Sequence, residues 1–131
     1  MLRPKVKEAE FIGRTAYLEQ RSTPPVATLC TLTVDDPTSS TGAKRYMLGR
    51  EPILTAAGEP ITDAKGRRSF VTSAGSGPSV GKHILFSYLP PEQAVAGTSL
   101  QVEYFGERYP VTVDVVGSTP LFDPANERIR C

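Results

Sequence analysis

The run SGPSVGKH at residues 76–83 is the part of this sequence that comes nearest to a ligand-binding motif. A phosphate-binding loop has the pattern GxxxxGK[ST], in which backbone N–H groups surround the phosphates and the final hydroxyl holds Mg²⁺. Gly81 and Lys82 fit this pattern, whereas Ser76 and His83 occupy the positions of the first glycine and of the hydroxyl. Two defining positions of the motif therefore carry the wrong residue.

The residues after this run also argue against a nucleotide site. A phosphate-binding loop must open a helix, because the positive end of the helix dipole completes the anion site. The following HILFSYLPP is instead an alternating, β-branched and aromatic run that ends in two prolines, which is typical of a strand. We interpret residues 75–82 as a connection between two strands, in which Gly75 and Gly77 allow positive φ and Pro78 fixes the turn.

The other side chains of catalytic type have simpler explanations. The lone His83, at the start of a predicted strand, is of a kind that is most often structural or solvated. Cys30 lies in an apolar run with no histidine near it in the sequence, which predicts a buried, unreactive thiol. Asp35 and Asp36 precede a proline and a polar loop, so turn formation accounts for them. From the residues alone we expect no self-contained catalytic site.

The cysteine and histidine content limits metal and disulfide chemistry. The sequence has two cysteines, Cys30 and Cys131, and one histidine, which cannot supply the usual His/Cys metal site. Cys131 is the last residue, and a terminal residue is a poor disulfide partner, so we interpret both cysteines as thiols in a reducing cytosol. These features predict a cytoplasmic protein without a bound metal ion.

The charge balance argues against nucleic-acid and membrane partners. The formal net charge is only +1, which gives no general attraction to nucleic acids. Short basic clusters lie at residues 44–45, at residues 67–68, and at Arg128 with Arg130. Such clusters are typical of solvated surfaces. No apolar run reaches the roughly 20 residues that a membrane-spanning helix needs, and no secretory signal is visible. We therefore expect neither nucleic acid nor a membrane as a partner.

The elements that must position these residues are mostly short strands. Residues 9–21 form the one predicted helix of substantial length, and the prolines that follow Thr23 stop it. The 11 Gly and 12 Pro residues predict many turns. Six runs are rich in β-branched and aromatic residues and are predicted to be strands, at residues 26–36, 51–55, 69–74, 83–89, 99–105 and 108–117.

The last two of these runs have the clearest strand pattern. Each has one apolar face, made of Leu100, Val102 and Tyr104 in the first and of Val111, Val113 and Val115 in the second. Six or so short strands at close spacing predict an all-β fold, a small six- to seven-stranded antiparallel β-barrel with an N-terminal helix. We expect residues 1–25 to be a helical segment that ends a preceding domain, and residues 26–131 to be the barrel domain.

The order of the motifs along the chain resembles that of a known family. The chain runs EFIGRTAYLEQ, LCTLTVDD, LGREPIL, GRRSFVTSAGSGPSVGKHILFSYLPPE, GTSLQVEYFGERYPVTV and PLFDPANERIR. Across residues 8–130 this order resembles the C-terminal barrel domain of the glycine cleavage T-protein (aminomethyltransferase) family. The long loop TAAGEPITDAKGRRS is most similar to the versions fused to FAD-dependent sarcosine or dimethylglycine dehydrogenases.

The resemblance implies a part of a tetrahydrofolate-dependent one-carbon transferase. In such proteins an amine releases a one-carbon unit that tetrahydrofolate captures, and most of the folate pocket belongs to the preceding domains. The barrel closes that pocket, and by motif position the resemblance assigns a folate contact to Arg128, whose guanidinium would pair with the glutamate carboxylate of folate. FAD would belong to the parent protein only, and the isolated chain is expected to be inactive.

Two expectations about partners follow. A barrel that normally packs against missing folate-binding domains should expose an apolar patch, through which the fragment would form a homodimer. The alternative function is a small barrel that binds a protein partner, or RNA through Arg67, Arg68 and Lys82. The near-neutral charge of the chain counts against RNA.

Overall fold

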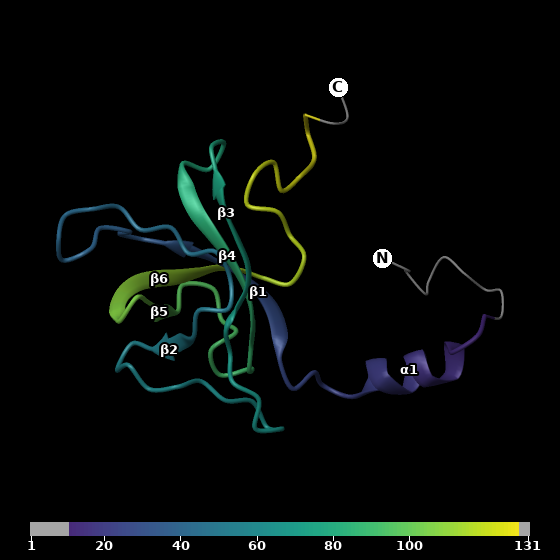
Figure 1. Ribbon diagram of the computed structural model, residues 1–131. Helices are drawn as coiled ribbons and strands as arrows, with labels where there is room; N and C mark the ends of the chain where they lie inside the picture. The colour runs from purple at the N-terminus through teal and green to yellow at the C-terminus, as the bar shows by residue number, and fades with distance from the viewer. Residues whose placement is uncertain (1–10, 129–131) are drawn as a thin grey trace.

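Residues 11–128, which the computed structural model describes, form one short helix and six strands (Figure 1). The elements are α1 (Arg14–Ser22), β1 (Thr28–Val34), β2 (Ile53–Thr55), β3 (Val71–Gly77), β4 (Lys82–Leu89), β5 (Ser99–Tyr104) and β6 (Glu107–Val116). The strands form a single sheet in the order β2-β5-β6-β1-β4-β3, and all neighbouring strands are antiparallel. The predicted all-β fold with an N-terminal helix is confirmed.

The two edges of the sheet approach each other at one end only. The Val71 N–H donates to the Glu51 carbonyl at 2.8 Å, and the Arg50 N–H donates to the Val71 carbonyl at 2.6 Å. An isolated bridge also joins Pro52 to Phe70. Within the described residues, the free edge of β3 pairs with no other strand and makes only these few bonds near Val71. The sheet is therefore barrel-like and not closed.

The core lies inside the curved sheet and follows the alternation of the strands. Leu100 and Val102 are buried and Tyr104 packs against the core, so the predicted apolar face of β5 is confirmed. The buried core cluster contains Cys30, Leu32, Val34, Met47, Ile53, Ile61, Val71, Leu85, Leu89, Leu100, Val102, Tyr109, Val111 and Val113. Met47 and Ile61 come from connecting segments, so the long loops also close the core.

A bulge in β6 corrects the prediction that Val115 shares the core face. Leu32 pairs with Val113, whereas the preceding Thr31 pairs with Val115, so β6 uses one residue more than β1 at this point. Directly paired residues lie on the same face, and successive residues of β1 point to opposite faces. Val115 therefore lies on the face of Thr31, on the outside of the sheet, while Val111 and Val113 are buried.

The helix is shorter than predicted and has no core contact. Residues 9–21 were expected to be helical, but α1 begins at Arg14 and ends at Ser22, before the prolines. Residue 9 and residue 10 lie outside the described part of the chain. None of the helix residues is buried, and α1 projects away from the sheet (Figure 1). An apolar side facing a core is therefore not found in this helix.

The hairpin of β3 and β4 corrects the interpretation of the glycine-rich run. β3 continues to Gly77, so Gly75 and Gly77 are strand residues, and neither has a positive φ. The left-handed residue of the turn is Gly81, with φ 73°. A Cβ at Gly77 would lie 2.6 Å from Ile84 Cδ1, so at this position glycine provides space and not backbone freedom.

Candidate functional site

The C-terminal tail is held in shape by one carboxylate, that of Asp123. Its Oδ1 accepts the Glu127 N–H at 2.8 Å and its Oδ2 accepts the Arg128 N–H at 3.0 Å. The Asp123 carbonyl also accepts the Asn126 N–H at 2.9 Å. These bonds fold residues 123–128 into a compact turn, because a short acidic side chain can satisfy backbone donors that follow it.

The turn places Arg128 beside an aromatic ring. The guanidinium carbon of Arg128 lies 4.9 Å from the centroid of the Phe122 ring, within the range of a cation–π interaction. Arg128 is exposed, and Phe122 retains 43% of its accessible surface. The one predicted site residue is thus presented to solvent in a defined position, whereas its neighbour Arg130 lies outside the described residues.

An apolar groove runs beside this tail. It has a volume of about 340 Å³ and lies between the tail and the outer side of β1 and β4. The lining residues are Leu29, Thr31, Val80, Ile84, Phe86 and the tail residues 117–122. Of these side chains none is charged, so the groove can take apolar groups but offers no acid or base.

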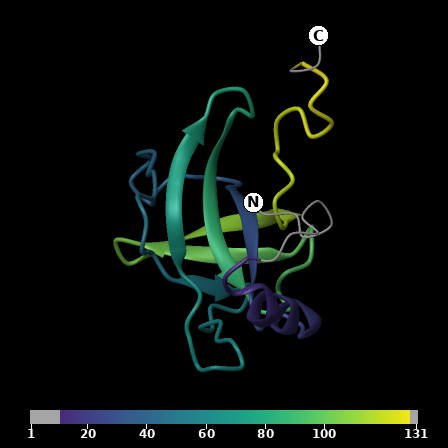
Figure 2. The same cartoon turned by 90° about the vertical axis from the view of Figure 1, so that its right-hand side faces the viewer.

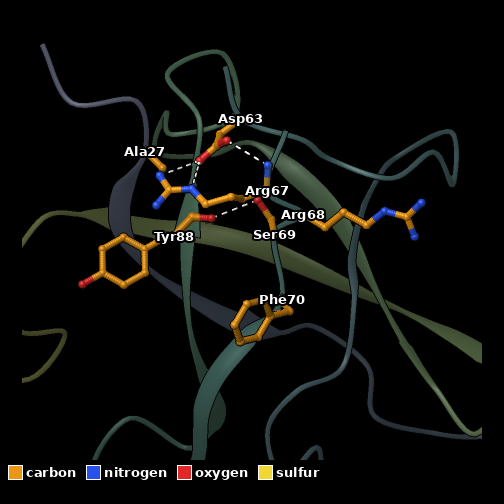
Figure 3. A pocket seen from close by; sticks show the side chains of 7 residues that line it. All are labelled: Ala27, Asp63, Arg67, Arg68, Ser69, Phe70 and Tyr88. Atoms are coloured by element: carbon orange, nitrogen blue, oxygen red, sulfur yellow. Dashed lines mark hydrogen bonds and ion pairs between the residues drawn. The ribbon is translucent and has the colours of Figure 1, made fainter. Parts of the chain in front are cut away.

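A second hollow, of about 290 Å³, lies at the other end of β4 (Figure 3). Its polar centre is the Asp63–Arg67 ion pair, in which Arg67 Nε donates to Asp63 Oδ2 at 2.8 Å. Asp63 Oδ1 accepts the N–H groups of Lys65 and Arg67, and the Arg67 N–H is the main cause that lowers the pKa of the Asp63 carboxyl. The aromatic side chains of Phe70 and Tyr88 also line this hollow and are 47% and 54% exposed.

This arrangement does not favour RNA binding by Arg67, Arg68 and Lys82. Arg67 is paired with Asp63, and Figure 3 shows the Arg68 side chain extending away from that pair. Lys82 begins β4, whereas Arg67 and Arg68 line a hollow with Tyr88, six residues further along the strand. At a rise of about 3.3 Å per residue the two sites are roughly 20 Å apart. The three cations do not form one patch.

A third hollow, of about 300 Å³, contains His83 and Ser76 from the glycine-rich run. His83 Nε2 donates to the Met47 carbonyl at 2.9 Å, and the Ser76 hydroxyl lies 3.4 Å from Nδ1. The Tyr46 ring stands edge-on to the imidazole, with 5.2 Å between centroids. His83 is only 7% exposed, and both ring nitrogens have hydrogen-bond partners. The imidazole thus joins the loop before β2 to the β3–β4 hairpin. The interpretation of His83 as a structural residue is confirmed.

Cys30 and Asp36 have the expected structural roles, whereas the Asp35 side chain bonds a neighbouring strand and not its own turn. Cys30 is a fully buried free thiol, and burial raises its pKa. Asp36 Oδ1 accepts the Thr38 N–H at 2.9 Å, and the bonds from Thr38 lower the pKa of the Asp36 carboxyl. Asp35 Oδ2 accepts the Thr112 hydroxyl at 2.9 Å. Cys131 lies outside the described residues.

Asp123 and Phe122 are site residues that the sequence analysis missed. Asp123 precedes a proline, which is a common turn signal, so the turn itself was within reach of the sequence. The position of Phe122 beside Arg128 depends on that turn and has no local signature. Within residues 11–128 there is no group of three or more metal-ligating side chains and no helix long and apolar enough to cross a membrane.

Comparisons with known proteins identify the barrel. Residues 28–123 match the glycine cleavage T-protein C-terminal barrel domain, which is more than half of the chain. A similar solved structure is the glycine cleavage system aminomethyltransferase T from Bartonella henselae, with 24% sequence identity and a TM-score of 0.59. The match covers 80% of this chain and 25% of that one. At this identity the likeness shows a shared fold, and the chain spans about a quarter of the length of the matched protein.

Proposed function

Because the chain belongs to the glycine cleavage T-protein C-terminal barrel family, we propose that it is the domain that closes the folate site of a tetrahydrofolate-dependent aminomethyltransferase-type protein. The family match over residues 28–123 is the observation that carries this proposal. The folate-binding domains of the parent protein are the partner, and tetrahydrofolate is the cofactor that captures the one-carbon unit. In this proposal residues 1–25 end the preceding domain and residues 26–131 are the barrel.

Arg128 is the proposed folate-binding residue. Its guanidinium is exposed, and its backbone is fixed by the Asp123 carboxylate. A guanidinium presents a planar pair of N–H donors that match the two oxygens of a carboxylate, such as the glutamate of folate. The Phe122 ring under the guanidinium restricts the arginine before any ligand arrives, which lowers the entropic cost of binding.

The source of the one-carbon unit belongs to the parent protein. Glycine cleavage and the demethylation of sarcosine or dimethylglycine would use the same barrel, and the second reaction would require FAD in the parent. Four hollows among the described residues are open to solvent and offer no enclosed acid and base pair that could act on the amine. The proposal therefore gives the barrel a role in binding, in a protein of the cytoplasm.

Replacement of Arg128 in the parent protein tests the folate contact. Arg128→Ala should weaken tetrahydrofolate binding by about 10- to 100-fold, the effect of losing a hydrogen bond to a charged group. Arg128→Lys should recover only part of the affinity, because lysine cannot form the bidentate pair. Calorimetry provides the measurement, and Arg68→Ala, an exposed arginine at the other end of β4, is the control. An unchanged affinity in Arg128→Ala would exclude the contact.

A further inference from the structure

A fourth hollow, of about 260 Å³, lies beside β2 at one edge of the sheet. Its charged lining residues are Arg68, Arg108 and Glu103, and we call it the Arg108 hollow. Figure 1 and Figure 2 show the segment that follows β2 at the bottom of the molecule and the tail after β6 at the top. The Arg108 hollow is therefore separate from the proposed folate contact at Arg128.

A glycine gives the Arg108 side chain a defined place in this hollow. Gly58 has a φ of 86° and lies in the turn after β2, where its N–H donates to the Thr55 carbonyl at 2.9 Å. A Cβ at Gly58 would lie 2.9 Å from Arg108 Cζ and still closer to Nη1, so the guanidinium occupies the space that any other side chain would fill. The guanidinium thus rests on the backbone of the turn and is restricted before any ligand arrives.

The donors of the two arginines in the hollow are available to a ligand. Arg108 Nε lies 3.6 Å from Glu103 Oε2, which is longer than a hydrogen bond, and the two side chains are 51% and 41% exposed. Within residues 11–128 no group accepts a hydrogen bond from Nη1 or Nη2 of Arg108 or from the guanidinium of Arg68. Both guanidinium groups can therefore donate to an anion that enters the hollow.

The charge and the walls of the hollow indicate the class of that anion. The two arginines carry two positive charges and Glu103 carries one negative charge, so a monoanion would leave the hollow neutral. A guanidinium presents a planar pair of N–H donors that matches the two oxygens of a carboxylate. Pro52 and Pro60 also line the hollow and are exposed, and they offer apolar surface to a short hydrocarbon group.

From these observations we infer that the Arg108 hollow binds a small carboxylate that carries a short apolar group. The carboxylate pairs with the Arg108 guanidinium, Arg68 supplies the second positive charge, and the apolar group lies against Pro52 and Pro60. Glu103 repels a second negative charge and so favours a monoanion over a dianion. The inference does not depend on the proposed function, because it uses only residues of this chain.

Titration of the 131-residue chain with sodium butyrate, at constant ionic strength, tests the site. Backbone amide NMR shifts of Gly58, Arg68 and Arg108 should saturate with a Kd of about 1–10 mM, as expected for so small a probe. Acetate lacks two methylene groups and should bind about fivefold more weakly. Shifts that do not saturate, or that saturate only elsewhere in the chain, would overturn the inference.

Two further probes test the class of ligand. Butylamine has the same hydrocarbon chain and a positive charge, so it should cause no saturable shifts in the Arg108 hollow. Inorganic phosphate is largely a dianion at pH 7.5 or so and should bind more weakly than butyrate. Binding of butylamine at this site, or tighter binding of phosphate than of butyrate, would overturn the assignment to a carboxylate.

Charge variants identify the side chains that bind. Arg108→Gln should weaken butyrate binding by at least about tenfold, the effect of losing a hydrogen bond between charged groups. Arg21→Gln, which removes the same charge from an exposed position in α1, is the matched control. Glu103→Gln should strengthen binding by about threefold, because it removes a repelling carboxylate. Equal affinities in Arg108→Gln and Arg21→Gln would overturn the inference.

Gly58→Ala tests the place of the guanidinium without a change of charge. The new methyl group would overlap with the Arg108 guanidinium and move it, so butyrate binding should weaken by at least about fivefold. Alanine is unfavourable at a positive φ, and the amide spectrum shows whether the variant folds. Unchanged affinity in a folded Gly58→Ala would contradict the assigned geometry, and if the variant does not fold, the comparison of Arg108→Gln with Arg21→Gln decides.

Discussion

At the scale of single residues, several carboxylates hold loops by accepting backbone or hydroxyl hydrogens, and three of them differ clearly in their surroundings. Asp123 organises the tail, Glu51 holds the loop before β2, and Glu107 attaches the loop of residues 38–45 to β6. The surroundings of the three differ, since Glu51 is buried and the other two carboxylates bond exposed loop groups. Removal of each carboxylate is therefore expected to change the free energy of unfolding and the local protection of the chain to a different extent.

Asp123→Ala should loosen the tail without unfolding the barrel. The variant loses the bonds to the Glu127 and Arg128 N–H groups, so their hydrogen exchange should accelerate. The turn is exposed, and the free energy of unfolding should change by less than about 0.5 kcal/mol. In the parent protein tetrahydrofolate binding should weaken as well, because Arg128 is no longer positioned. Unchanged exchange at Arg128 would show that the turn does not depend on this carboxylate.

Glu51→Ala should destabilise the isolated barrel strongly. Glu51 is 7% exposed, and its two oxygens accept the N–H groups of Leu48 and Gly49 at 2.8 to 3.1 Å. Loss of these charge-assisted, part-buried hydrogen bonds should cost about 2–3 kcal/mol. Urea denaturation measures the change, with the exposed Glu59→Ala as the matched control. A cost equal to that of Glu59→Ala would contradict the assigned role.

Acid should release the loop of residues 38–45 through Glu107. The Ser40 hydroxyl is the main cause that lowers the pKa of the Glu107 carboxyl, and the Tyr109 hydroxyl, which donates to it at 2.8 Å, adds to the effect. The folded-state pKa of Glu107 thus lies below its pKa in the unfolded chain, which is about 4.3. The contribution of the ionised carboxylate to the free energy of unfolding is therefore complete above the unfolded-state pKa and is lost as the pH falls through the folded-state pKa. The protection factor of the Ser40 N–H, which is its exchange rate relative to the unprotected rate at the same pH, should therefore fall in acid, and Glu107→Gln should remove this change. An identical profile in Glu107→Gln would exclude Glu107 as the titrating group.

At the scale of elements, the sequence predicted what local alternation controls. The apolar face of β5 follows from a period of two residues, and β-branched and aromatic runs located the six strands, although β3 continues to Gly77 beyond its predicted end at residue 74. The bulge that turns Val115 outward could not be predicted, because it depends on the register between β1 and β6. The candidate site was likewise predictable only in part. The motif resemblance indicated Arg128, whereas the position of the Phe122 ring beside it depends on how the tail folds.

The β3–β4 hairpin gives a test of why its glycines are needed. Gly77→Ala should destabilise the chain by about 1 kcal/mol, because the new methyl group displaces the Ile84 side chain. Gly75→Ala should instead stabilise it by about 0.5 kcal/mol, since the site has open space and no positive φ. Urea denaturation measures both, and Ile84→Ala should remove most of the cost of Gly77→Ala. Equal effects at the two glycines would contradict this assignment.

At the scale of the whole molecule, β4 has apolar residues on both sides, and the tail lies beside only part of its outer side. Leu85 and Leu89 fill the core, while Phe86 and Tyr88 point outward next to them. Strands that are apolar on both faces are normally covered on both faces. The barrel thus has a filled core and, on the outer side of β4, aromatic side chains that stay partly exposed to water.

Tyr88→Thr should therefore have different effects in the isolated chain and in the parent protein. In the isolated chain the ring is 54% exposed, so the free energy of unfolding should fall by less than about 1 kcal/mol. In the parent a domain packed on this side of the sheet would cover the ring, and its loss should then cost about 2 kcal/mol or more, the value for a fully buried large apolar side chain. The control Phe105→Asn removes a ring from the turn between β5 and β6 and should have the same small effect in both proteins. Urea denaturation of the four variant proteins gives the comparison, and an equal cost of Tyr88→Thr in the two contexts would mean that the parent leaves this face in water.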